Sequence, residues 1–177
     1  MQGLVNFAGQ IGNAIAILLP TFCYAAALVC FLFAGWGFWM QSHPENPFRG
    51  KPWIPFVSLV LSGVFSTFDR TLTMANATAG TNLQVSVTAL TSYTPPTIGG
   101  VLGAGPGETV VNVVQLFLGF FQSFGAMACF FAFLAWRSVV NGRSNRSATS
   151  CGVQFVFGVM LINIATITQW LVTMFQA

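Results

Sequence analysis

Both ends of the sequence, residues 1–42 and 147–177, contain no acidic or basic residue. Within the first, residues 14–40 form an apolar run that would be about 40 Å long as an α-helix at 1.5 Å per residue. That length exceeds the ~30 Å hydrocarbon core of a bilayer. We therefore expect a membrane helix over residues 6–41 that tilts, kinks at Pro20 or projects beyond the membrane. Only 5% of the chain is charged, whereas an ordinary soluble domain is about 25% charged, so a soluble fold is excluded.

Three further apolar segments predict three more membrane helices. They start near residues 53, 108 and 152, and they run past 68, to about 140 and to about 175. The predicted fold class is an all-α membrane protein whose four transmembrane helices form two helix–basic turn–helix hairpins. We expect a single membrane-embedded helical domain over residues 1–177. It consists of a first hairpin (6–75), a neutral connecting segment (76–107) and a second hairpin (108–177).

The two predicted turns, 42–52 and 137–150, hold five of the six basic residues in or beside them. The positive-inside rule places both turns in the cytoplasm, and it places the termini and the segment 76–107 on the other side. The basic groups would meet lipid phosphates at the inner leaflet, so a phospholipid is a candidate ligand. The alternative is that they only fix topology. These residues are Arg49, Lys51, Arg137, Arg143 and Arg146.

The two halves resemble each other at a nearly constant offset of 99 residues, and each is a long helix, a basic turn and a second helix. Chance identities are common between apolar helices, but the shared charge layout favours an internal duplication. The matches include Phe22 with Phe121, Ala27 with Ala126, Cys30-Phe31 with Cys129-Phe130, Phe56-Val57 with Phe155-Val156, Thr67 with Thr166 and Leu72 with Leu171.

Five residues are candidate interfacial or subunit contacts. Asp69 and Arg70 fall near the far end of the second helix, where an interfacial anchor or subunit contact is favoured over an ion or proton site. Ala34 and Ala132 lie in faces of small residues, and such faces fit either packing within the chain or contact between copies of it. Asn163 is a polar residue deep in the fourth helix, and it could bond a neighbouring helix.

Signatures of catalysis are missing from the sequence. His43 is the only histidine and lies in a turn, and the chain has no HExxH motif, Ser/His/Asp set or phosphate loop. We therefore expect no enzyme, no catalytic or metal-binding residue and no cofactor. The net charge of +3 is too small for a nucleic-acid footprint, so sequence-specific nucleic-acid binding is not expected. We also expect no signal peptide, because the first apolar run is too long and lacks a basic flank.

Short motifs in residues 50–175 resemble the IcmC/DotE proteins of type IVB secretion systems and their conjugative relative TraQ of IncI-type plasmids. The resemblance implies a component of the bacterial inner membrane that works with other secretion or conjugation subunits and has no catalytic activity. The motifs are Pro55-Phe56-Val57 through Gly63, Thr67-Phe68-Asp69, Leu90-Thr91-Ser92-Tyr93, and Gly158-Val159-Met160-Leu161-Ile162-Asn163-Ile164 with Thr173 after it.

A second resemblance is architectural. Conjugative pilins look like two apolar helices joined by a short basic turn, and this chain is similar to two such hairpins in tandem, although it is longer than a pilin. The resemblance implies a homo-oligomer and leaves two roles open: a fixed inner-membrane platform, or a pilus subunit whose basic turns line the lumen outside the cell. The alternatives are a small membrane channel or transporter and a tetraspan adaptor.

Overall fold

In a computed structural model the chain is helical throughout most of its described residues, which are 2–81, 83–85 and 105–176. These ranges hold seven α-helices and no strand, so the all-helical class is confirmed for them. Most of the predicted connecting segment 76–107 lies outside the described residues. The helices are α1 (Gln2–Met40), α2 (Trp53–Ser66), α3 (Phe68–Thr78), α4 (Pro106–Leu116), α5 (Leu118–Val140), α6 (Ala148–Ile162) and α7 (Ile164–Gln176).

Two of these helices, α1 and α5, are long and apolar enough to cross a membrane. The pair α6 and α7 would make a third span if it counts as one bent element. The helix α2 is apolar but has only 14 residues, about 21 Å, which is shorter than a ~30 Å hydrocarbon core. The described helices are therefore consistent with a membrane location, and two or three of them, rather than four, meet the length and composition of a span.

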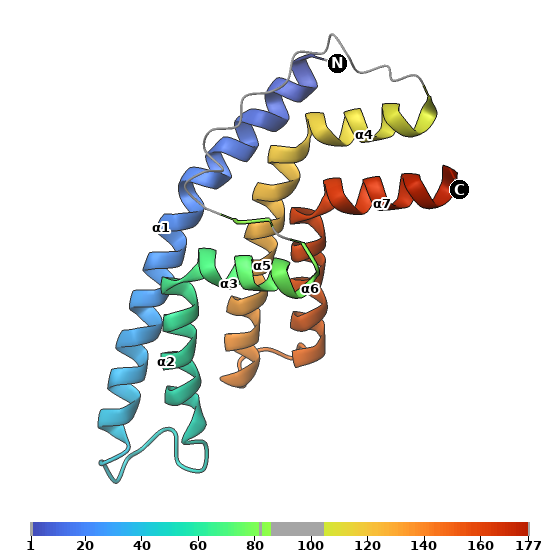
Figure 1. Ribbon diagram of the computed structural model, residues 1–177. Coiled ribbons are helices and arrows are strands. Elements are labelled where there is room, and N and C mark those ends of the chain that lie inside the picture. The colour runs from blue at the N-terminus through green and yellow to red at the C-terminus, as the bar shows by residue number, and fades with distance from the viewer. Residues whose placement is uncertain (1, 82, 86–104, 177) are drawn as a thin grey trace.

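The long helices are arranged as two antiparallel hairpins, with α1 packed against α2 and α5 packed against α6 (Figure 1). Helix α5 also contacts α1 and α2, so it joins the two hairpins. Glycines let the helices of each hairpin approach closely. A Cβ atom on Gly37 would lie 2.6 Å from Cγ of Pro55, and one on Gly125 would lie 2.6 Å from the carbonyl oxygen of Gly158. Such contacts are typical of helices that pack in a membrane.

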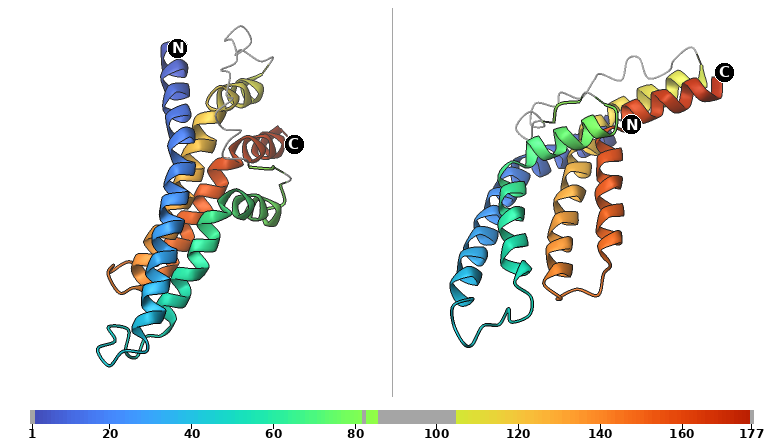
Figure 2. Two further views of the ribbon diagram at one scale, coloured as in Figure 1. Left: turned by 90° about the vertical axis from the view of Figure 1, so that its left-hand side faces the viewer. Right: turned by 60° about the horizontal axis from the view of Figure 1, so that its bottom comes forward.

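Three of the four predicted helices are broken near the end away from the basic turns. The breaks fall at Thr67, Phe117 and Asn163, and the pieces beyond them, α3, α4 and α7, run across the direction of the hairpins (Figures 1 and 2). The bend between α6 and α7 is 76°. Helix α1, in contrast, continues through Pro20, so the helix expected over residues 6–41 extends over Gln2–Met40.

The core lies where α1, α2, α5 and α6 meet, and it contains Leu19, Cys30, Phe65, Cys129 and Ile162. Large apolar side chains also cover the outside of the hairpins. Trp39, Phe56 and Phe157, for example, are each about 60% exposed. Soluble monomers rarely expose contiguous apolar surface on this scale. The hairpins therefore have an apolar interior and an apolar exterior, as helices in lipid do.

Candidate functional site

The two basic turns lie at the same end of the molecule (Figure 1). Arg49 and Lys51 in the first turn and Arg143 and Arg146 in the second are all exposed. Four of the five basic residues singled out from the sequence therefore lie exposed in two turns at one end of the hairpins. The fifth, Arg137, is placed differently.

Local backbone chemistry fixes the second turn. Gly142 adopts φ +68°, a left-handed conformation that favours glycine. Its N–H donates to the carbonyl of Val139 (2.9 Å), and the N–H of Arg143 donates to the carbonyl of Ser138 (3.0 Å). This pair of bonds is a Schellman motif, which ends α5. At the other side of the turn the Ser147 side chain caps α6 by accepting from the N–H of Ser150. Arg143 is thus held just outside the helix end.

Arg137 is half-buried and lies where α5 faces α1 of the other hairpin. Its guanidinium carbon is 5.2 Å from the centre of the Phe33 ring on α1, close enough for a cation–π contact. Its Nε atom is buried and has no hydrogen-bond partner among the described residues. The Phe33 ring also packs edge-on against Phe48 of the first turn. Arg137 therefore connects α5 to α1 and is less available to an outside ligand than the other four basic residues.

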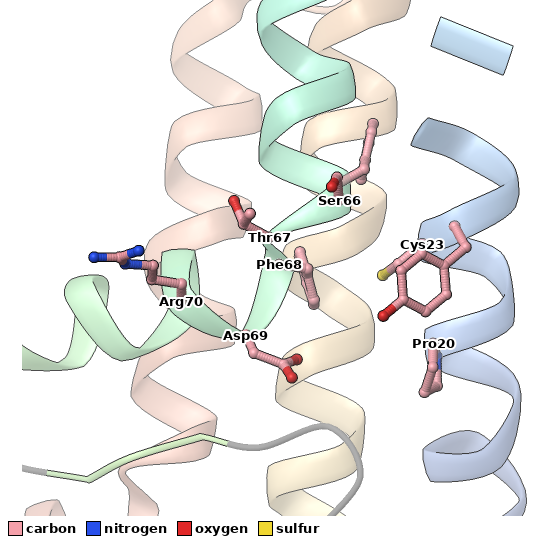
Figure 3. A pocket seen from close by; sticks show the side chains of 9 residues that line it. Pro20, Cys23, Ser66, Thr67, Phe68, Asp69 and Arg70 are labelled. Carbon is pink, nitrogen blue, oxygen red and sulfur yellow. The ribbon is translucent and has the colours of Figure 1, made fainter. Parts of the chain in front are cut away.

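Asp69 and Arg70 begin α3, just after the break at Thr67. A cavity of about 280 Å³ lies between this bend and α1, lined by Pro20, Cys23 and Asp69 among others. The carboxylate of Asp69 points toward α1, whereas Arg70 points away from it (Figure 3) and is exposed. The two charges do not face each other. They sit at the start of a transverse helix, not at the far end of a straight second helix as the sequence predicted.

Asn163 forms a buried polar node at the bend between α6 and α7. Its side-chain NH₂ donates to the Asn76 side-chain oxygen (2.8 Å) and to the Val159 carbonyl (2.9 Å). Its own side-chain oxygen accepts from the Thr81 hydroxyl at 2.7 Å. Both asparagines are buried, at 3% and 0% exposure for Asn163 and Asn76. The node satisfies buried amides that would otherwise destabilise the fold. It also joins the second hairpin to α3 through Asn76 and to the segment after α3 through Thr81.

Ala34 and Ala132, predicted as interfacial or subunit contacts, are buried within the single chain. Neither offers surface to a second copy, and the same holds for Asn163. The small faces are used for packing inside the chain, as the contact between Gly125 and Gly158 illustrates. Among the five predicted contact residues, only Arg70 is exposed.

Sequence reasoning missed Asn76 and Thr81, which complete the Asn163 node, and Pro20 as a cavity-lining residue. One feature of the sequence could have pointed to Asn76. An asparagine within a predicted helix is unfavourable unless its side chain has a hydrogen-bond partner, so its position suggests such a partner. Its partner is 87 residues away, and nothing in the local sequence specifies such a pairing.

Comparisons with protein-family models, with curated proteins and with solved structures find no match to this chain. Within the described residues, no three His, Cys, Asp or Glu side chains gather in a way that could hold a metal ion. The candidate sites in the structure are the four exposed basic residues in two turns at one end, the cavity beside Asp69 and the Asn163 node.

Proposed function

We propose that the protein is a non-enzymatic structural subunit of a conjugative, type IVB-like DNA-transfer apparatus in the bacterial inner membrane. The observation that carries the proposal is that both hairpins present a basic turn at the same end of a bundle with apolar flanks (Figure 1). The resemblance of residues 50–175 to the IcmC/DotE and TraQ proteins points to the same function.

The proposed topology has four membrane-crossing arms. Helices α1 and α5 cross completely, and α2 and α6 return from the basic turns toward the other leaflet. The turns face the cytoplasm, where Arg49, Lys51, Arg143 and Arg146 meet anionic headgroups, each contributing about 1 kcal/mol. The exposed apolar flanks are available for lipid and for homo-oligomer contacts.

Two roles in the apparatus fit this arrangement. A fixed platform subunit would keep its basic turns at the inner leaflet, and a pilus subunit would turn them toward the lumen of a filament. In either position, exposed arginines would screen a passing polyanion. Imaging of the purified assembly distinguishes the two roles, because a filament and a ring have different shapes.

The second candidate function is a small membrane channel or transporter, and the cavity beside Asp69 is the feature that favours it. The Asn163 node does not favour it, because its amide groups are already hydrogen-bonded within the chain. Ion flux through vesicles that contain the purified protein would support the channel.

The test of the leading proposal is DNA transfer from a donor whose gene for this protein is deleted and then supplied as variants. Replacing Arg143 and Arg146 with Gln should lower transfer on the order of tenfold or more, because the turn loses its positive field. The matched control replaces both with Lys, which keeps the charge and should keep transfer. Membrane level and orientation should be equal in both variants, since Arg49, Lys51 and Arg137 remain. Normal transfer in the deletion strain would overturn the proposal.

A further inference from the structure

Helix α7 has two opposite surfaces that its own chain leaves open. Trp170 and Met174, four residues apart and therefore on one face, are 56% and 60% exposed. Leu171 and Phe175 extend this face at 41% and 88% exposure. The other face carries exposed polar residues at the same helical spacing, namely Thr166, Gln169 and Thr173. The two exposed faces of α7 therefore require different surroundings: an apolar one for the face with Trp170, and a polar one for the face with Gln169.

The direction of α7 is fixed by its surroundings. It leaves α6 at 76° and runs across the hairpins at the end away from the basic turns (Figure 2). The hydrogen bonds of Asn163 to Val159 and Asn76 hold the bend, and α4 packs beside α7. The helix is therefore a built transverse element of the fold.

Neither a fully aqueous nor a fully lipidic position suits this helix. In water, four large apolar side chains would be exposed together. Within hydrocarbon, the Gln169 amide and the Thr166 hydroxyl would face lipid tails without water to bond them, whereas the Thr173 hydroxyl already donates to the Trp170 carbonyl. At the boundary between headgroups and acyl chains each face meets its own solvent, and tryptophan is enriched there.

The length of α6 agrees with a boundary position. Its 15 residues span about 22 Å, less than a ~30 Å hydrocarbon core. An interfacial helix sinks its apolar face about 5–10 Å into the boundary. Helix α6 is about 8 Å shorter than the hydrocarbon core. If α7 follows the bend at Asn163 and sinks by about 5–10 Å, the two helices together cover that difference.

We propose that α7 is an in-plane helix that binds the phospholipid surface of the leaflet opposite the basic turns, with Trp170, Leu171, Met174 and Phe175 in the acyl region. The inference rests on the membrane embedding within the proposed function and not on DNA transfer. Apolar side chains are exposed on α6 as well, where Val153 and Phe157 are 60% and 64% exposed.

The test places a nitroxide label at single introduced cysteines in the full-length protein, reconstituted in vesicles of phosphatidylethanolamine and phosphatidylglycerol. Met174→Cys and Leu171→Cys report on the apolar face, and Gln169→Cys and Thr173→Cys are matched controls on the polar face. The four native cysteines are buried, so unmodified protein gives the labelling background. Collision rates with oxygen, which concentrates in lipid, and with a water-soluble nickel complex are measured at each site.

We expect the apolar-face labels to collide with oxygen and the polar-face labels to collide with nickel, so that the preference alternates along the helix. Nickel access at all four sites would place α7 in water and overturn the proposal. Oxygen access at all four would make α7 part of a transmembrane span, which also overturns it. Shielding of the apolar-face labels from both reagents would mean that a second copy covers this surface, which excludes lipid there. The collision rates do not depend on DNA transfer, so this inference and the proposed function can fail separately.

Discussion

Asn163 shows how much one buried polar side chain can determine in an otherwise apolar chain. Its amide oxygen accepts from Thr81, and its NH₂ donates to Asn76 and to the carbonyl of Val159. The last of these is a bond back to its own helix at the position where α6 ends. One residue thereby ends a helix and joins parts of the chain that are 87 residues apart.

Replacing Asn163 with Leu should lower the free energy of unfolding by about 1–3 kcal/mol, because the buried Asn76 oxygen and Thr81 hydroxyl lose a partner. The measurement is reversible unfolding of the protein in mixed detergent micelles. The control is a double-mutant cycle with Asn76→Leu. Since both substitutions break the same bond, the double variant should lose less than the sum of the singles. Additive losses would show that the node does not act as a unit.

At the scale of the helices, the sequence predicted which segments are helical. The prediction succeeded because a long uncharged apolar segment in a membrane must bond its backbone internally, which an α-helix does. The broken ends were not predicted. Thr67, Phe117 and Asn163 are neither proline nor glycine. Threonine and asparagine side chains can compete with helical hydrogen bonds, but Thr71 and Asn76 lie inside α3, so residue type alone does not locate the breaks. At Thr67 the backbone leaves the helix (φ −116°, ψ 41°), while the hydroxyl bonds the Gly63 carbonyl. At Asn163 the break coincides with side-chain bonds to Thr81 and Asn76, which lie 82 and 87 residues away in the sequence.

The sequence predicted the exposed basic residues of the candidate site, but it did not predict which of the other site residues are buried within the chain. The exposed positions of Arg49, Lys51, Arg143 and Arg146 agree with the predicted turns, because turn residues follow directly from the charge pattern. The burial of Ala34 and Ala132 could not be distinguished from a subunit contact, since small residues suit both kinds of helix packing. The contact of Arg137 with the other hairpin depends on Phe33, about a hundred residues earlier, which the sequence does not connect with it.

The contact between α5 and α6 makes a prediction at this scale. A Cβ atom at Gly158 would lie 2.5 Å from Cys129 Sγ and 2.7 Å from the Gly125 carbonyl oxygen. Gly158→Ala should therefore push the two helices apart and cost about 1–3 kcal/mol of stability. Gly152→Ala is the matched control on the same helix, because a Cβ atom there would have no neighbour within 4 Å. It should be neutral or slightly stabilising, since alanine favours helices. Equal stability of the two variants, measured by unfolding in mixed micelles, would contradict the close packing.

At the scale of the whole molecule, both halves contain a long helix, a basic turn, a short helix and a transverse helix after a break. The halves differ in that the transverse helix α4 precedes α5, whereas α1 is unbroken over Gln2–Met40. The breaks after α2 and α6 fall at Thr67 and Asn163, which are 96 residues apart and close to the sequence offset of 99. The similar order supports the proposed duplication. It also means that the two basic turns lie at one end and the transverse helices lie toward the other (Figure 1).

That polarity gives a topology prediction for the intact chain. Glu45 and Asn145 are exposed in the two turns, and Gln169 is exposed on α7, so each can be replaced by Cys without removing a basic residue. In intact spheroplasts a membrane-impermeant maleimide should label Gln169→Cys, whereas Glu45→Cys and Asn145→Cys should react only after lysis. The expectation rests on the proposed topology, in which the basic turns stay in the cytoplasm and α7 binds the opposite leaflet. The unmodified protein, whose cysteines are buried, gives the background. Labelling of only one of the two turns from outside would place them on different sides of the membrane and contradict a structure in which both turns lie at the same end (Figure 1).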